Sequence, residues 1–296
     1  MSNNSGMGKW LCLVMCTFVA ILPSVCNAVT FTWWSGTGAW ENGANWDQGG
    51  LIPGESDQAN IYTGTVTIST TQKCFVSLIG FGVSTTTLDI QAGGSLTQAV
   101  TEMIIGIAGG GPTAPSVVNV EGTATLASLR IGGEGTNNYG IMNINGGSVT
   151  VTSFGTYLGT RWDNTNTGIA TVNISNGGTF TIDGMGALGN RIDIKDGSHV
   201  NLLDSTATLK VKDDYTTYLQ GLINAGKITG INSPRCFLAV SFHADDGYTY
   251  VKESKCICTT FPPEDMNHDC YVDFHDFAFF AQGWLSCTNP IDANCL

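Results

Sequence analysis

The stretch Met142-Asn-Ile-Asn-Gly-Gly147 is followed 30 residues later by Val172-Asn-Ile-Ser-Asn-Gly-Gly178, and this recurrence decides the fold. In both copies an apolar residue, an asparagine and an isoleucine come before a glycine turn. Related copies occur at Leu88–Gly94, Val118–Gly122 and Ile192–Gly197. Self-similarity at a regular period indicates a stack of small structural units that bury their apolar faces against one another.

A second arm, an apolar residue followed by glycine, alternates with the first one. Its copies are Ile105-Gly106, Ile131-Gly132, Leu158-Gly159 and Leu188-Gly189, at spacings of 26, 27 and 30 residues. Within each unit apolar and polar residues alternate, as in Ser148-Val-Thr-Val-Thr152, which predicts short strands with one buried face. A unit of this length, with short strands and glycine turns, is typical of one coil of a parallel β-helix.

We therefore predict a mainly β fold, a short parallel β-helix of about four or five coils over residues 87–212. A β-sandwich built from the same strands is the alternative, and the regular period favours the helix. One position of the first arm is polar in every copy, and its residues are Asp89, Asn119, Asn143, Asn173 and Asp193. We expect these side chains to stack into a polar ladder on the outer surface.

The glycine-rich repeats resemble those of autotransporter passenger domains and related bacterial surface β-helices. Residues 29–86 come before the repeats and are rich in tryptophan: Trp33, Trp34, Trp40 and Trp46. This segment resembles the first strands that open such β-helices, and we predict that it caps the first coil, because an uncapped end invites polymerisation. The alternative is a carbohydrate-stacking platform, since indole faces bind sugar rings.

Residues 213–258 predict a cap at the other end of the helix. Asp213–Gly226 has the aspartates, the helically spaced apolar residues and the final glycine of a short amphipathic helix. The strands Phe237–His243 and Tyr248–Lys252 then form a hairpin, in which the last residue of the first strand faces the first residue of the second.

The cysteines indicate disulfides in the C-terminal third of the chain. The hairpin register sets Cys236 opposite residue 255, which predicts a bond with Cys256, and Cys258 is the alternative partner. By elimination, Cys270 pairs with Cys287 or Cys295. Beyond residue 28 the count of cysteines, with Cys74, is seven, so at least one stays unpaired or pairs with another chain. A zinc site is disfavoured, because the one-residue spacer between Cys256 and Cys258 is too short for a zinc knuckle.

The first 28 residues have the parts of a secretory signal peptide: Lys9, the apolar run Trp10–Leu22 and the small residue Ala28. A membrane anchor is the alternative, but the apolar run is shorter than the roughly 20 residues that a spanning helix needs. We expect a mature chain that is secreted or held at a bacterial cell surface, in an oxidising compartment and with no membrane span. The net charge of −12 argues against nucleic acid and anionic membranes as partners.

A proline-bearing linker, residues 259–264, leads into a module at residues 265–296. Oxygen ligands stand there at positions 1, 3, 5, 7, 9 and 12 of a loop: Asp265, Asn267, Asp269, Tyr271, Asp273 and Asp276. This is the ligand spacing of an EF-hand-type loop, with Tyr271 acting through its carbonyl group and Asp273 through water. We predict Ca²⁺ as the cofactor; a solvated acidic turn is the alternative.

The apolar residues Phe274, Phe277, Phe280, Ala281 and Trp284 recur at helical spacing and predict the helix that such a loop requires. Together, loop and helix resemble a dockerin repeat, the unit by which bacterial polysaccharide-degrading systems plug into cohesin receptors. The resemblance covers Asp265–Trp284 and implies a cohesin-like partner. The chain departs from the family in carrying a single repeat, with Asp292–Asn294 as the stub of a second one.

Secreted β-helices and dockerin-bearing proteins are often polysaccharide-degrading, so the competing function is a polysaccharide-binding protein, a lyase or a glycoside hydrolase. The side chains weighed for acid and base chemistry are Arg161, Asp163, Asp183, Arg191, Asp193 and Asp196. They form no recognisable glycosidase motif, and we assign no catalytic residue. The sequence therefore predicts a non-catalytic extracellular protein that is attached through its calcium module to a cohesin-like protein or a cell-surface polysaccharide.

Overall fold

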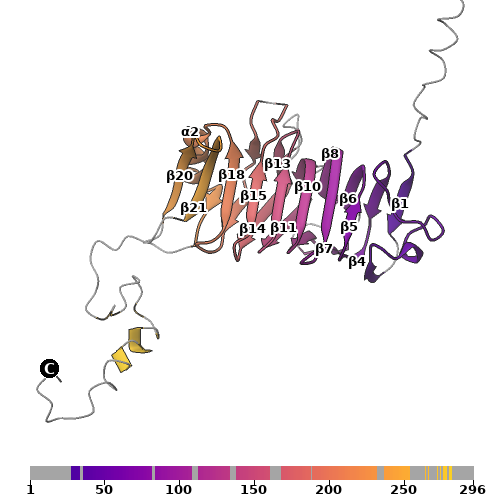
Figure 1. Cartoon of the computed structure of the whole chain (residues 1–296), viewed down its shortest axis with the longest axis horizontal. Coiled ribbons are helices and arrows are strands. Elements are labelled where there is room, and N and C mark those ends of the chain that lie inside the picture. The colour runs from indigo at the N-terminus through magenta and orange to yellow at the C-terminus, as the bar shows by residue number, and fades with distance from the viewer. Residues whose placement is uncertain are drawn as a thin grey trace, which may run out of the picture.

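A computed structural model describes residues 28–33, 36–81, 84–108, 113–133, 138–160, 168–187, 189–231 and 237–253, with residues 264, 266, 272, 274, 276–278, 280 and 281. The described chain forms a parallel β-solenoid of about six turns. The turns follow one another along a single axis, from β1 at one end to β20 at the other (Figure 1). The predicted mainly β solenoid is confirmed, and the β-sandwich is wrong, because strands of successive turns pair in parallel.

The strands form three faces around the axis. Face 1 contains β1 (Thr30–Trp33), β3 (Gln58–Ile61), β6 (Val76–Phe81), the second parts of β8 (Ser95–Ala108) and β10 (Thr123–Ile131), β13 (Thr156–Leu158) and β16 (Ile192–Ile194). Face 2 contains β2 (Thr37–Ala39), β4 (Gly64–Ile68), β7 (Thr86–Ile90), β9 (Ser116–Val120), β11 (Tyr139–Asn145), β14 (Ile169–Ser175), β17 (His199–Leu202) and β19 (Ile228–Thr229).

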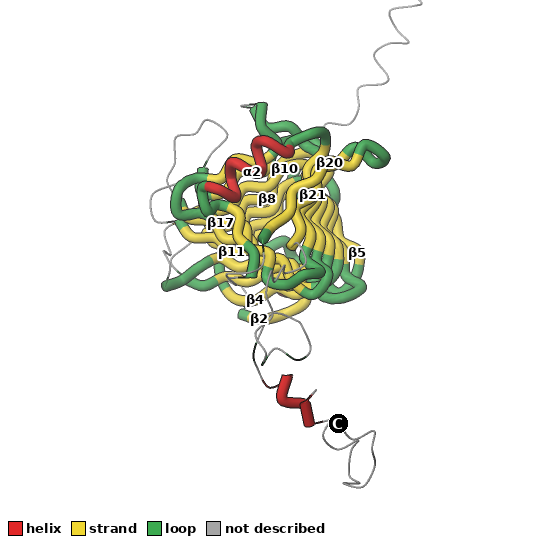
Figure 2. Tube along the Cα trace, turned by 90° about the vertical axis from the view of Figure 1, so that its left-hand side faces the viewer, coloured by secondary structure: helices red, strands yellow, loops and turns green. Residues whose placement is uncertain are grey.

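Face 3 contains β5 (Thr71–Lys73), the first parts of β8 and β10, β12 (Ser148–Val151), β15 (Thr179–Ile182) and β18 (Thr208–Lys212), and it ends with β21 (Tyr248–Glu253) and β20 (Leu238–His243). Strands β8 and β10 each contribute to two faces, so faces 1 and 3 are continuous at that corner. Seen at 90° to the first view, the strands of successive turns lie behind one another around a common interior (Figure 2).

The interior is a set of apolar columns that run along the axis. On face 2 one column consists of Val66, Leu88, Val118, Met142, Val172, Val200 and Ile228, each directly paired with the next and at most 1% exposed. These side chains alternate along the strands with half-exposed ones, most of them polar, which is the period-2 pattern of the sequence. Stacking therefore converts a weak local alternation into one continuous core.

Glycine is required where the backbone of one turn touches that of the next. Gly132 has φ of +67°, and a Cβ atom there would lie 2.3 Å from the carbonyl oxygen of Ile169. Gly106 and Gly159 have φ values of +78° and +71° at matching corners of the neighbouring turns. The glycine of the recurring apolar-glycine arm is thus a corner residue in the left-handed region. A side chain there would strain the backbone and clash with the neighbouring turn.

One predicted copy of the repeat belongs to a different face. Ile192–Ile194 was assigned to the first arm, but this strand pairs with Thr156–Leu158 on face 1. The first arm of that turn is β17, in which Asn201 pairs with Asn173. Asp193 is therefore not part of the ladder, whereas Asp89, which pairs with Asn119, is. The prediction was wrong because Ile-Asp-Ile has the same local alternation as either arm.

The solenoid also has more turns than the predicted four or five. The same faces continue without a break into residues 29–86, where β1 to β4 and β6 pair in parallel with their neighbours. The sequence there has the alternation of a strand but lacks the repeated asparagine and glycine motif. The repeat count thus underestimated the length of the body.

The N-terminal tryptophans lie inside the first turn. Trp33, Trp40 and Trp46 are 0%, 0% and 4% exposed, and Trp46 packs edge-on against both of the others, with ring centroids 5.2 Å and 4.9 Å away. The indole nitrogen of Trp46 donates to the carbonyl oxygen of Trp40 at 2.9 Å. These three side chains therefore have no exposed face on which a sugar ring could stack; Trp34 lies outside the described residues.

The last turn is covered by a helix and a hairpin. Helix α2 (Thr216–Asn224) buries Leu219, and Tyr218 and Leu222 pack against the end of the core. In Figure 2 this helix lies across the end that faces the viewer. Strand β21 pairs antiparallel with β18 and with β20, and His243 stands opposite Tyr248 in the predicted register. The parallel stack thus ends in an antiparallel pair.

Candidate functional site

Asp276, at the last position of the loop, is the one predicted calcium ligand that lies among the described residues. Asp276 is 3% exposed, and its Oδ1 accepts a hydrogen bond of 2.8 Å from the backbone N–H of Met266, the second residue of the loop. This bond joins residues ten positions apart and brings the end of the loop back to its beginning. The other predicted ligands, Asp265, Asn267, Asp269, Tyr271 and Asp273, lie outside the described residues.

From Phe274 onward the described residues are helical: Phe274, Asp276–Ala278, Phe280 and Ala281. Phe274, Phe277 and Phe280 are 89%, 65% and 38% exposed, so the apolar face predicted for this helix is largely open to solvent. The donor set of the loop consists of carboxylate, amide and carbonyl oxygens, which suits a hard divalent cation.

The predicted disulfides cannot be located, because Cys236, Cys256, Cys258, Cys270, Cys287 and Cys295 lie outside the described residues. Cys74 is described, and it is a free thiol that is 1% exposed. Burial raises the pKa of this thiol to about 12. Cys74 is thus a core residue and not a reactive one.

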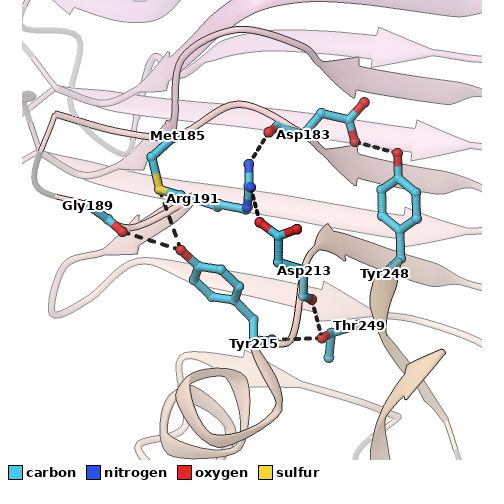
Figure 3. A network of polar contacts seen from close by, with 8 residues as sticks. All are labelled: Asp183, Met185, Gly189, Arg191, Asp213, Tyr215, Tyr248 and Thr249. Atoms are coloured by element: carbon cyan, nitrogen blue, oxygen red, sulfur yellow. Dashed lines mark hydrogen bonds and ion pairs between the residues drawn. The ribbon is translucent and has the colours of Figure 1, made fainter. Parts of the chain in front are cut away.

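Two of the side chains weighed for acid and base chemistry hold the C-terminal cap in place (Figure 3). Arg191 is 6% exposed; it donates to the carbonyl oxygen of Asp183 and forms an ion pair with Asp213. The carboxylate of Asp183 accepts a 2.7 Å hydrogen bond from the phenol of Tyr248. That bond is the largest cause that raises the pKa of Tyr248 to about 12.

The same network reaches the start of the capping helix. The hydroxyl group of Tyr215 donates to the carbonyl oxygen of Gly189 at 3.3 Å, and the backbone N–H of Tyr215 donates to Thr249 at 2.8 Å. The hydroxyl group of Thr249 in turn donates to the carbonyl oxygen of Asp213 at 2.7 Å. Asp183 and Arg191 therefore connect the last turn to the hairpin and the helix. These contacts explain the positions of both side chains as structural ones.

The remaining candidates lie apart from this network. Asp193 accepts a hydrogen bond of 2.9 Å from Asn190, and Asp196 forms an ion pair of 2.9 Å with Lys227. Both aspartates line a hollow beside Tyr218. Arg161 and Asp163 lie outside the described residues.

A polar groove on face 2 was not predicted from the sequence. Two parallel columns line it over four consecutive turns: Asp89, Asn119, Asn143 and Asn173 in the first, and Gln91, Glu121, Asn145 and Ser175 in the second. Ile90 and Leu203 complete the lining, and the hollow has a volume of about 500 Å³. Residues two apart on a strand face the same side, so each turn adds one residue to each column.

The first column is a ladder of hydrogen-bonded side chains. Asn119 donates to Asp89 at 2.7 Å; Asn143 donates to Asn119, Asn173 to Asn143 and Asn201 to Asn173, each at 2.8 Å; and Thr229 donates to Asn201 at 2.7 Å. Every donor belongs to the later turn and every acceptor to the earlier one. The signal in the sequence was the recurring asparagine, but the hollow beside it depends on side chains from a second column.

Among the described residues there is no helix long and apolar enough to cross a membrane. No family model, no curated protein and no solved structure matches the chain. Functional conclusions therefore rest on the residues themselves.

Proposed function

We propose that the protein is a secreted, non-catalytic extracellular protein whose C-terminal module binds calcium and attaches the solenoid body to a cohesin-like protein or a surface polysaccharide. The observation that carries the proposal is the hydrogen bond between Asp276 and the backbone of Met266, because it closes a twelve-residue segment with the spacing of a calcium loop. The solenoid, with its rigid core, would act as the part that is displayed.

Calcium would act as the folding partner of this module. Four of its six predicted ligands are aspartates, and their carboxylates repel one another in the absence of a cation. Phe274, Phe277 and Phe280 are exposed to solvent, so these side chains do not form a buried core for the module. A segment this short has little else to fold around, so binding of the ion and ordering of the loop should be coupled.

Limited proteolysis of the full chain tests the calcium site. We expect calcium to slow cleavage after about residue 260 and to leave cleavage within the body unchanged. Asp276→Asn keeps an oxygen that can accept from Met266 but removes the charge, and should abolish this protection. Asp246→Asn, in the exposed turn of the hairpin, is the matched control and should behave like the native chain. Equal cleavage with calcium and with chelator would contradict the proposal.

The attachment function has a separate test. A cohesin-like receptor immobilised on beads should retain the full chain with calcium and release it with chelator. Calcium binding without retention by any such receptor would leave a metal-stabilised tail and remove the docking role. Release of reducing or unsaturated sugars from a polysaccharide would instead favour the competing enzymatic function.

A further inference from the structure

We propose that the groove on face 2 is a binding site for an extended, neutral polysaccharide chain that lies parallel to the solenoid axis. This site belongs to the body, does not involve the calcium module and uses none of the tryptophans. It goes beyond the attachment function, because the body itself, and not the C-terminal module, would hold this ligand.

The hydrogen-bonding capacity of the ladder is the first argument. Each asparagine amide has two N–H donors and an oxygen with two lone pairs. Asn143 uses one N–H toward Asn119 and one acceptor position toward Asn173. The ladder bonds therefore account for only half of each amide, and these side chains are half-exposed along the floor of the groove. Each of the three asparagine rungs in the groove, Asn119, Asn143 and Asn173, therefore offers a donor and an acceptor to a ligand, and Asp89 offers acceptors.

The spacing of these groups is the second argument. Successive strands in a sheet lie about 4.8 Å apart, so the amides repeat at that distance along the axis. The residues of an extended sugar chain repeat at nearly the same length, and each carries hydroxyl groups that both donate and accept. The second column, with Gln91, Glu121, Asn145 and Ser175, adds a further line of polar groups with the same repeat. A chain laid along the groove could therefore use equivalent contacts on every turn.

Charge decides the class of polysaccharide. The residues that line the groove include two carboxylates, Asp89 and Glu121, and no lysine or arginine. The whole chain has a net charge of −12. A polyuronate or a sulfated glycan would be repelled from such a surface, because nothing in the lining compensates its charge. Neutral hexose or pentose polymers meet no such barrier.

The experiment is calorimetric titration of the full chain with hexasaccharides. The neutral probes are derived from cellulose, xylan, mannan and β-1,3-glucan, and the anionic probe is oligogalacturonate. We expect at least one neutral probe to bind and oligogalacturonate not to bind. Binding should persist in chelator, which separates this site from the calcium module, so that failure of one leaves the other standing.

Two double variants locate the site. Gln91→Ala with Glu121→Ala removes two exposed polar groups from the groove without touching the ladder, and should weaken binding about tenfold, the loss of two hydrogen bonds of about 0.7 kcal/mol each. Thr97→Ala with Thr150→Ala removes two hydroxyl groups from the outer side of face 3 and should change nothing. Failure of every neutral probe, tighter binding of oligogalacturonate, or equal effects of the two double variants would overturn the proposal.

Discussion

The solenoid body and the C-terminal module use the same residue type in opposite ways. In the body, Phe180 is 0% exposed and lies in a column between Val149 and Leu209 of the adjacent turns. In the module, Phe274 is 89% exposed. The body is stable because each turn covers the apolar face of the previous one, whereas the module has no neighbouring turn. This difference is the reason for the proposal that the module, unlike the body, folds around a ligand.

The largest expected effect on stability comes from changing Phe180 to alanine, and Phe274→Ala is the variant to compare with it. Phe180→Ala should lower the free energy of unfolding of the body by about 3–5 kcal/mol, because it removes a buried ring and leaves a cavity. Phe274→Ala should change it by less than about 0.5 kcal/mol. Urea denaturation followed by far-ultraviolet circular dichroism measures both. Similar losses from the two variants would show that the module packs on the body and would break the comparison.

Calcium should act on one region only. At a concentration about 100 times its dissociation constant, a ligand stabilises the form that binds it by about 2.7 kcal/mol. We expect this gain in the hydrogen-exchange protection of the backbone near Asp276, and no change in the unfolding midpoint of the solenoid. A calcium-dependent rise in that midpoint would mean that the two regions unfold together.

Loss of one rung of the ladder should have a moderate effect. Asn143→Ala removes two side-chain hydrogen bonds, one to each neighbouring turn. The expected cost is about 1–2 kcal/mol, a fall of roughly 2–8 °C in the melting temperature of a body of this size. Thr150→Ala, on face 3 of the same turn, is the control and should cost less. An unchanged melting temperature for Asn143→Ala would mean that the ladder follows from the stacking and does not stabilise it.

The smallest effect concerns pH. Partial burial acts against ionisation of Asp204, but hydrogen bonds from Thr206, Asn176 and Ala207 outweigh it and lower the pKa of this carboxyl group. Its folded pKa thus lies below the unfolded one, so its contribution to stability is present above about pH 4 and is lost as the pH falls through the folded pKa. Because the group is mostly solvated, we expect less than about 1 kcal/mol.

Comparison of urea curves at pH 7 and pH 3 tests this prediction. Asp204→Asn should be less stable than the native chain at pH 7 and equally stable at pH 3. A difference that persists at the lower pH would assign the effect to packing.

The parallel stack could be predicted from the sequence because its cause is local and repeated. Alternation sets which side chains enter the core, and glycine sets where the chain turns, as at Gly132. The face to which a strand belongs could not be predicted in the same way. Ile192–Ile194 has the alternation of either arm, and only its pairing with Thr156–Leu158 in the folded chain assigns it to face 1.

The candidate sites show the same division. The calcium loop is a contiguous motif, so spacing alone suggested it, and the described part, Asp276 with Met266, is compatible with it. The groove on face 2 depends on residues from several turns, and its second column, which includes Gln91 and Glu121, has no repeated identity that a sequence pattern could reveal. The burial of Trp33 and Trp40 likewise depends on how the first turn closes.

The place where the tail leaves the body has a mechanical consequence. The tail continues from Glu253, the last residue of β21, so tension applied through it would reach the pairing of Glu253 with Leu238 first, and then that of Lys252 with Thr208. Pulling along the axis would open the β18–β21 pairs one at a time, toward Tyr248. At that far end the phenol of Tyr248 is tied to Asp183, and Arg191 holds Asp213. We expect strand separation to require more force at that point, so that β21 protects the earlier turns of the solenoid from tension applied through the tail.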